Sequence, residues 1–164
     1  MNEYPQKFDS SKLDNIDKSI IQSFFDRRKI FDVYIEQNKL KIFTCPCCGY
    51  PTLAERGGFS MCTVCLWEDD GQDNETADEV WGGPNSDISL SEGRIQIGKL
   101  FQRLSMEVNG QVHNSPQEVF HCLSDRDNII STAKQKISYD TKGDDPAWKK
   151  LKRLREETIK SLLI

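Results

Sequence analysis

Hydrophobic side chains recur every three or four positions in several parts of the chain, and this spacing predicts amphipathic helices there. Near the N-terminus the spacing is followed by Leu13, Ile16, Ile20 and Phe24. After residue 89 it is followed by Leu90, Ile97, Phe101, Leu104 and Val108. Close to the C-terminus it is followed by Trp148, Leu151, Leu154 and Leu162. The chain is therefore expected to contain helices at both ends and after its middle.

Capping signals define where several of these helices begin. Ser89 and Glu92 form a capping box, in which each side chain can satisfy an orphan backbone N–H of the first turn. Ser115 and Glu118 repeat this arrangement, with Pro116 at the first helical position, where proline is favoured. We expect helices to begin at these two boxes and at Pro146, and Ser10 or Ser11 to cap the first helix.

A different pattern precedes the first cysteine. Hydrophobic and polar residues alternate over residues 31–36 and again over 39–42. Strict alternation is typical of half-buried strands, so we expect two short strands around residues 37–38. The helical period could also continue through Phe31 and Ile35.

The middle of the chain, residues 45–88, is rich in Gly, Pro, Cys and acidic residues and has no helical period. Only 37% of the 164 residues are hydrophobic, and the mean hydropathy is −0.62. A segment with so little apolar area needs something other than burial to hold it in one conformation.

Four cysteines can hold this segment in one conformation. Cys45, Cys48, Cys62 and Cys65 follow the pattern C-x2-C-x13-C-x2-C, which is typical of a four-thiolate zinc site. Two thiolates separated by two residues reach one ion only when the backbone makes a tight knuckle. Pro46 sets φ for that turn, and Gly49 can adopt a positive φ. The sequence therefore predicts a closed, structural zinc site.

The other two cysteines and the two histidines allow alternatives. Cys47 is expected to pack against the site, although a role in metal exchange or redox chemistry is an alternative, and Cys122 is expected to be a buried hydrophobe. A redox dithiol is disfavoured because Pro51 blocks a helix behind the thiols. A catalytic zinc needs an open position, and His113 and His121 are remote in sequence.

Charge is distributed unevenly along the chain. Residues 57–93 hold nine acidic residues and no Lys, Arg or His, within a protein of net charge −4. This segment is expected to be a solvated loop, with a docking face for a basic partner as the main alternative. A calcium loop is disfavoured because the spacing does not fit a 12-residue EF-hand. The candidate partner-binding residues are Glu68, Asp69, Asp70, Asp73, Glu75 and Trp81.

The opposite charge collects near the C-terminus. Lys149, Lys150, Lys152, Arg153 and Arg155 lie on the last predicted helix. They are expected to form a solvated helix face, with nucleic-acid contact as the alternative. The overall acidity disfavours nucleic acid as the main partner.

Two further absences bear on location. No hydrophobic run approaches the ~20 residues of a membrane span, and the first residues have no basic region leading into an apolar stretch. We therefore expect a cytoplasmic protein whose thiols stay reduced.

The strings CPCCGY at 45–50, ERGGF at 55–59, CTVCLWEDDGQ at 62–72 and WGGPN at 81–85 resemble the bacterial cysteine-rich CPCC domain family. The resemblance covers about residues 44–98. It implies a small zinc-binding ribbon in a bacterial cytosolic protein, with a role that is mostly unassigned. Some members sit in toxin–immunity loci, which implies inhibitory protein binding. The family supplies no catalytic residue.

These observations predict an α+β fold, in which a four-cysteine zinc ribbon with short antiparallel strands packs against several helices. The expected parts are an extension over residues 1–44, a zinc module over 45–105 and C-terminal helices over 106–164. The predicted function is non-enzymatic: a protein-interaction module that inhibits a bacterial toxin. A nucleic-acid-binding regulator and a thiol redox protein are the alternatives.

Overall fold

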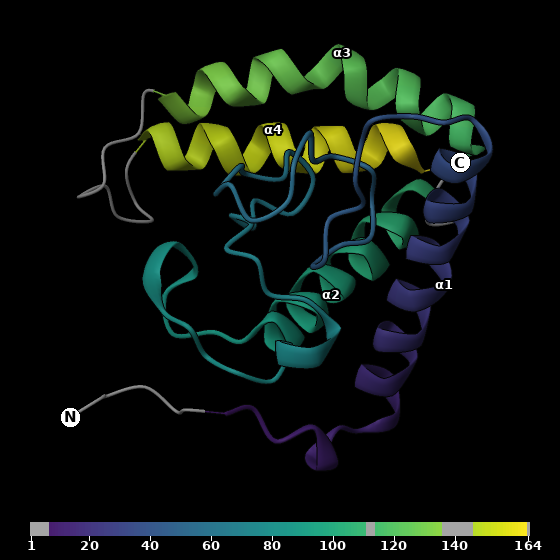
Figure 1. Ribbon diagram of the computed structural model, residues 1–164. Coiled ribbons are helices and arrows are strands. Elements are labelled where there is room, and N and C mark those ends of the chain that lie inside the picture. Colours follow the sequence, from purple (N-terminus) through teal and green to yellow (C-terminus); the bar gives the residue numbers. More distant parts are fainter. Residues whose placement is uncertain (1–6, 111–113, 136–145, 164) are drawn as a thin grey trace. The chain divides into compact units, whose positions relative to one another are not determined.

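The computed structural model describes residues 7–110, 114–135 and 146–163. Its long elements are four α-helices: α1 (Asn15–Gln37), α2 (Leu90–Val108), α3 (Pro116–Gln135) and α4 (Pro146–Leu162) (Figure 1). Three single-turn 3-10 helices accompany them: η1 (Ser10–Lys12), η2 (Asn74–Thr76) and η3 (Gly83–Asn85). The chain divides into two compact units, Met1–Leu100 and Phe101–Ile164, and the division falls within α2.

The predicted α+β class is wrong. Within the three described ranges, the structure contains helices and isolated bridges but no strand or sheet. The expected antiparallel strands of a zinc ribbon are reduced to single bridges, Phe43 with Leu53 beside the first cysteine pair and Met61 with Glu68 beside the second. Each bridge stops after one residue pair because the chain then enters turns, including positive-φ positions at Gly57 and Phe59.

The strand predicted over residues 31–36 belongs instead to α1. Ile20, Phe24, Arg27 and Phe31 are the buried residues of this helix, and their spacing follows the helical period. Val33 is exposed, so the alternation that suggested a strand does not place Phe31 and Val33 on the same face. Asp14, not a serine, caps the helix by accepting a hydrogen bond from the N–H of Asp17 at 2.8 Å. Burial of one stripe of α1 within unit 1 therefore favours a helix over a strand for residues 31–36.

The predicted starts of the later helices are confirmed. The N–H of Glu92 donates to the Ser89 hydroxyl at 3.1 Å, and the N–H of Ser89 donates to the Glu92 carboxylate at 3.2 Å. Helix α2 begins directly afterwards at Leu90. Helices α3 and α4 begin at the prolines Pro116 and Pro146.

Unit 2 contains the end of α2 together with α3 and α4. Helices α3 and α4 lie side by side and run in opposite directions (Figure 1). The buried apolar residues of this unit are Phe101, Leu104, Val119, Leu123, Ile130, Ala133, Leu151, Ile159, Leu162 and Leu163. Burial of this helical core supplies the main hydrophobic stabilisation of the unit.

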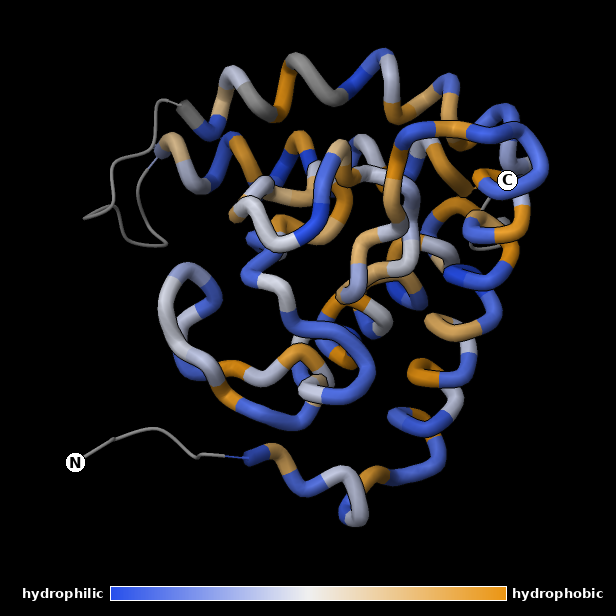
Figure 2. Tube along the Cα trace, in the orientation of Figure 1, coloured by the Kyte–Doolittle hydropathy of each residue, from blue (hydrophilic) through white to orange (hydrophobic). Residues whose placement is uncertain are grey.

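Hydrophobic and hydrophilic residues alternate along all four helices (Figure 2). This alternation gives each helix one face for the core and one for solvent. In the described ranges, none of the helices combines the length and the apolar character that crossing a membrane would require.

Candidate metal centre

The four cysteines of the predicted zinc pattern lie together in unit 1. The Sγ atoms of Cys45, Cys48, Cys62 and Cys65 all lie within 4.8 Å of one another. Across the two pairs, the distances are 3.6 Å between Cys45 and Cys65 and 3.6 Å between Cys48 and Cys62. Three of the thiols are buried, and Cys65 is half-buried. These four residues form a cluster that is able to hold a metal ion.

The two cysteine pairs are held by turns of the same geometry. In the first, the N–H of Gly49 donates to the carbonyl of Cys45 at 2.9 Å; in the second, the N–H of Leu66 donates to the carbonyl of Cys62 at 2.9 Å. Each turn ends on a positive φ, 83° at Gly49 and 67° at Leu66. The glycine was expected from the sequence, whereas Leu66 adopts a conformation that a leucine rarely takes.

Backbone and hydroxyl groups point at the first sulfur of each turn. The N–H of Cys47 lies 3.4 Å from the Cys45 Sγ, and the N–H of Val64 lies 3.4 Å from the Cys62 Sγ. The Thr52 hydroxyl also donates to the Cys62 Sγ at 3.0 Å. Such donors offset the negative charge of a thiolate ligand.

The sulfur geometry fits a tetrahedral ion. Metal–sulfur bonds of about 2.3 Å give sulfur–sulfur edges of about 3.8 Å in a regular tetrahedron. The separations in the cluster, from 3.6 Å up to less than 4.8 Å, bracket that edge. Four soft thiolates in a closed arrangement are the donor set that zinc and iron prefer in structural sites.

The electrostatics of the thiols show why four thiolates here need a cation. Burial raises the pKa of Cys45, Cys48 and Cys65. Burial by itself also raises the pKa of Cys62, but hydrogen bonds from the other three thiols and from Thr52 lower it well below its usual range. One negative charge is thus stabilised by the thiols themselves. Four thiolates at these distances require a cation among them.

The remaining cysteines lie outside the cluster. Cys47 is buried, and a Cβ built on Gly93 would lie 3.1 Å from its Sγ and 3.1 Å from the Trp67 ring. Cys122 is half-buried on α3, with its Sγ 3.6 Å from the carbonyl of Ser161. His121 on α3 is exposed, and His113 lies outside the described residues.

Two buried arginines, which the sequence motifs did not predict, hold the first turn. Arg27 of α1 donates from Nε to the carbonyl of Cys48 at 2.7 Å. Arg94 of α2 donates from Nε to the carbonyl of Pro46 at 2.8 Å. A signal was present, because each arginine occupies a position on the apolar stripe of its helix.

Two of the six candidate partner-binding residues have charged partners within unit 1. Asp69 is fully buried and accepts from the Arg56 Nε at 2.9 Å and from the N–H of Gly57 at 2.7 Å. Asp73 accepts from Arg28 at 2.7 and 2.9 Å and from Arg56 at 2.7 Å. The arginines that flank the acidic segment or face it from α1 therefore neutralise its centre.

The other four candidates differ in their surroundings. The backbone of Glu68 exchanges two hydrogen bonds with the Asn85 side chain, at 3.0 and 2.7 Å. The Asp70 carboxylate accepts from the N–H of Gln72 at 3.1 Å. Glu75 and Trp81 are exposed, and the Trp81 Nε1 donates to the Glu79 carboxylate at 2.8 Å. Glu75 and Trp81 are thus the candidates most open to solvent.

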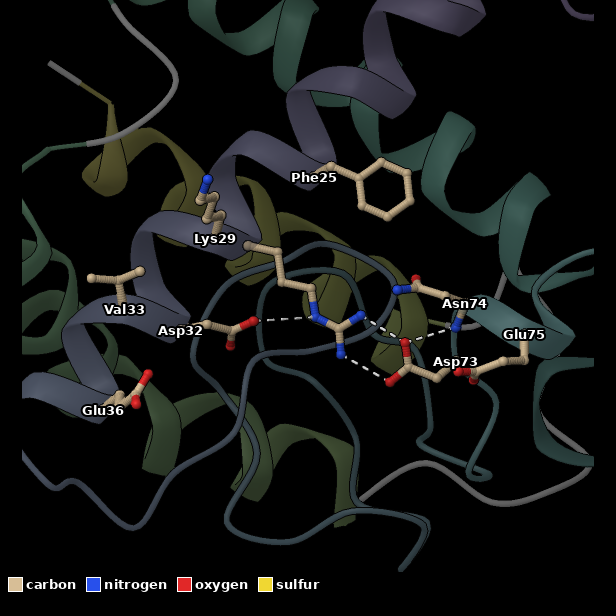
Figure 3. A pocket seen from close by; sticks show the side chains of 9 residues that line it. Phe25, Lys29, Asp32, Val33, Glu36, Asp73, Asn74 and Glu75 are labelled. Atoms are coloured by element: carbon tan, nitrogen blue, oxygen red, sulfur yellow. Dashed lines mark hydrogen bonds and ion pairs between the residues drawn. The ribbon is translucent and has the colours of Figure 1, made fainter.

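An open hollow of about 650 Å³ lies beside this network. One face of α1 and the segment 73–75 line it (Figure 3). Arg28 forms ion pairs with both Asp32 and Asp73, and dashed lines mark the interactions of these two carboxylates in Figure 3. The lining residues are Phe25, Arg28, Lys29, Asp32, Val33, Glu36, Asp73, Asn74 and Glu75.

Residues 43–110 match a family model described as Cysteine-rich CPCC. The resemblance that the sequence motifs suggested is thereby confirmed for this segment, which contains all four clustered thiols. Neither the curated proteins nor the solved structures gave a match to this chain.

Proposed function

We propose that Cys45, Cys48, Cys62 and Cys65 hold one zinc ion that maintains the fold of a protein-interaction module. The observation that carries this proposal is the convergence of four Sγ atoms within 4.8 Å of one another. The bound ion would supply a fixed cross-link between two turns in a segment with only single-turn helices between α1 and α2. Structural zinc contributes about 10–16 kcal/mol to small zinc-finger peptides.

Removal of the metal tests this role. Treatment of the zinc-loaded protein with a chelator should unfold the segment between α1 and α2, seen as faster amide hydrogen exchange there. Added zinc should restore protection. Cys62→Ala should behave like the chelated protein, and Cys122→Ala, which removes a thiol outside the cluster, should behave like the wild type. Unchanged exchange after complete removal of the metal would contradict the proposal.

The chemistry of the cluster supports a binding role without catalysis. Four thiolates close the tetrahedral shell of a zinc ion and leave no ligand position for a substrate. Such a role also requires a reducing compartment, for which the cytoplasm is the natural choice. The protein's surface is then the part that meets a partner.

We assign partner binding to the hollow beside α1. Phe25 and Val33 are 40% and 42% exposed there, so apolar area is available to a partner. Its lining has four acidic and two basic side chains, a formal charge of −2. A protein segment that carries a basic residue beside an apolar one complements this surface.

A displayed library of random peptides tests this assignment. Peptides selected on the zinc-loaded protein should be enriched in Lys or Arg next to an apolar residue. Their binding should be lost with Phe25→Ser and with Glu75→Lys. Asp87→Lys makes the same charge change outside the hollow and should leave binding intact. Peptides whose binding responds equally to Glu75→Lys and Asp87→Lys would contradict the assignment.

Inhibition of a toxin is a finer proposal that rests on the family resemblance. A toxin with a basic surface would complement the hollow in the same way as the selected peptides. Co-purification of this protein with the product of an adjacent toxin gene, lost with Glu75→Lys, would support it. A toxin that neither binds nor is inhibited would contradict it.

A second candidate function is nucleic-acid binding through α4. Lys149, Lys150, Lys152 and Arg153 are all exposed in the first half of this helix, which favours contact with phosphates. Binding of DNA or RNA should then weaken steeply with salt and disappear when Lys149, Lys150 and Arg153 are changed to Ala. The control Lys18→Ala removes an exposed charge from α1 and should have no effect.

A further inference from the structure

Two arginines from distant parts of the chain meet the first cysteine turn. Arg27 comes from α1 and Arg94 from α2, and their Nε atoms donate to carbonyls of that one turn, Cys48 at 2.7 Å and Pro46 at 2.8 Å. Only 5% of Arg27 and 3% of Arg94 is exposed. Arginine is rarely buried to this degree, so the presence of two beside one cluster needs an electrostatic reason.

Aromatic rings fix the two guanidinium groups in place. The Arg94 guanidinium lies 4.2 Å from the centre of the Phe24 ring, and the Arg27 guanidinium lies 5.5 Å from the centre of the Tyr50 ring. A cation over the face of an aromatic ring is held there by the ring's quadrupole. The positive charges are therefore immobilised next to the thiols.

The loaded metal cluster would carry a negative charge, and the two arginines lie beside it. A divalent ion with four thiolates carries a formal charge of −2, and burial of that charge is costly unless it is compensated. Elsewhere in unit 1, Arg28 and Arg56 form ion pairs with Asp69 and Asp73, and Arg28 also pairs with Asp32. The Arg94 Nη2 lies 3.9 Å from the Asp73 carboxylate and donates to the Asn74 side chain at 2.8 Å, so Arg94 connects this network to the first cysteine turn. Arg27 and Arg94 thus place two positive charges beside the cluster.

We propose that Arg27 and Arg94 are positioning residues that supply the countercharge of the metal–tetrathiolate cluster, so that metal affinity depends on their charge as well as on their hydrogen bonds. This inference rests on the proposed metal site. Since α1 and α2 each contribute one arginine, loading of the metal also strengthens the attachment of both helices to the cysteine segment.

Substitutions at Arg94 separate charge from hydrogen bonding. Gln retains an N–H donor without the charge, and Lys retains the charge. We expect Arg94→Gln to lower the affinity for Co²⁺ and Zn²⁺, measured by competition with a chelator at constant pH and salt, by about 10-fold or more, in the range seen when groups that support metal ligands are changed. Arg94→Lys should lower the same metal affinities by no more than about threefold.

Matched variants complete this comparison. Arg103→Gln removes an exposed arginine in unit 2 and should leave metal affinity unchanged. Arg27→Gln and Arg27→Lys repeat the comparison from α1 if an Arg94 variant fails to fold. Equal losses for the Gln and Lys variants would show that only the hydrogen bond matters and would overturn the proposal.

A change of ligand charge gives an independent test. Cys65, the most exposed of the four thiols, can be changed to His, which reduces the formal charge of the loaded cluster from −2 to −1. Arg94→Gln should lower Co²⁺ affinity in the wild type and in the Cys65→His background. The fold loss should be at least about threefold smaller in the Cys65→His background, because the effects of interacting sites are not additive. An equal loss of Co²⁺ affinity in both backgrounds would contradict the proposed countercharge role. Failure of the wild type to bind any metal would instead remove the proposed metal site itself.

Discussion

Both terminal nitrogens of Arg28, on α1, donate to the Asp73 carboxylate: Nη1 to Oδ1 at 2.7 Å and Nη2 to Oδ2 at 2.9 Å. A bidentate pair of this kind has a fixed geometry and is stronger than a single ion pair. The same guanidinium donates from Nε to the Thr44 hydroxyl at 3.1 Å, one residue before the first cysteine. The Arg28 side chain therefore connects α1 to Thr44, just before the first cysteine, and to Asp73, after the last cysteine of the cluster.

Asp73→Asn should lower the free energy of unfolding by about 2–4 kcal/mol. Breaking a buried pair costs about 3–5 kcal/mol, and the 25% exposure of the Asp73 side chain places it toward the lower end. Denaturant titration of the zinc-loaded protein at pH 7 measures the effect. Glu75→Gln changes an exposed carboxylate in the same segment and should cost less than about 0.5 kcal/mol. Similar costs for the two variants would contradict the role of Asp73.

The pH dependence of Asp73 has a definite sign. Burial by itself raises its pKa, but hydrogen bonds from Arg28 and Arg56 outweigh burial and hold the pKa well below 3.8. An aspartate with a depressed pKa stabilises the fold above its unfolded value of about 3.9, and this stabilisation is lost as pH falls below that value.

The stability difference between the wild type and Asp73→Asn should therefore stay constant from about pH 8 to pH 5 in saturating zinc, and narrow only below about pH 4. Denaturation curves of the two proteins across this range measure the difference. A difference that stays constant, or widens, as pH falls below about 4 would mean that the pKa of Asp73 is not depressed.

Gly93→Ala should destabilise unit 1, although alanine normally favours a helix by about 1 kcal/mol over glycine. The added Cβ would lie 3.1 Å from the Cys47 Sγ and from the Trp67 ring, which is tighter than most packing contacts, so the buried thiol and ring would have to shift by a few tenths of an ångström. We expect a net loss of about 1–3 kcal/mol. Gln96→Ala, at an exposed position of the same helix, should be neutral or slightly stabilising.

The added strain should be partly relieved by Cys47→Ala in the same chain, because this change removes one of the two contacts. Thermal unfolding of the two single variants and the double variant gives the coupling. Strict additivity would show that Gly93 is not packed on Cys47.

Cys47→Ala and Cys48→Ala should differ sharply in metal binding. The Sγ of Cys48 belongs to the four-thiol cluster, and that of Cys47 does not. Cys47→Ala should keep one metal per chain and the thiolate charge-transfer bands of bound Co²⁺. Cys48→Ala should lose or shift those bands. Loss of metal from Cys47→Ala would mean that the first turn uses a different thiol.

Local signals predicted the parts of the site that depend on residues near one another in sequence. The two C-x2-C spacings identified the turns, and the capping boxes at Ser89 and Ser115 located the starts of α2 and α3. In each case, the hydrogen bonds concerned join residues no more than four positions apart.

Long-range contacts explain what the sequence pattern missed. Residues 31–36 alternate like a strand, but burial of Phe31 on the same stripe as Phe24 keeps them in α1. Arg27 and Arg94 look like ordinary helix residues until the fold places them against carbonyls 21 and 48 positions away. The acidic segment resembles a solvated face, yet Asp69 and Asp73 lie against arginines from outside it.

X-ray absorption spectroscopy of the purified, reduced protein is the sharpest test of the proposed zinc site, because it reports the metal, its ligand atoms and their distances together. We predict one zinc per chain with four sulfur neighbours at about 2.3 Å and no nitrogen or oxygen bound to the metal. Protein that contains no metal, or a first shell in which nitrogen or oxygen replaces sulfur, would contradict it.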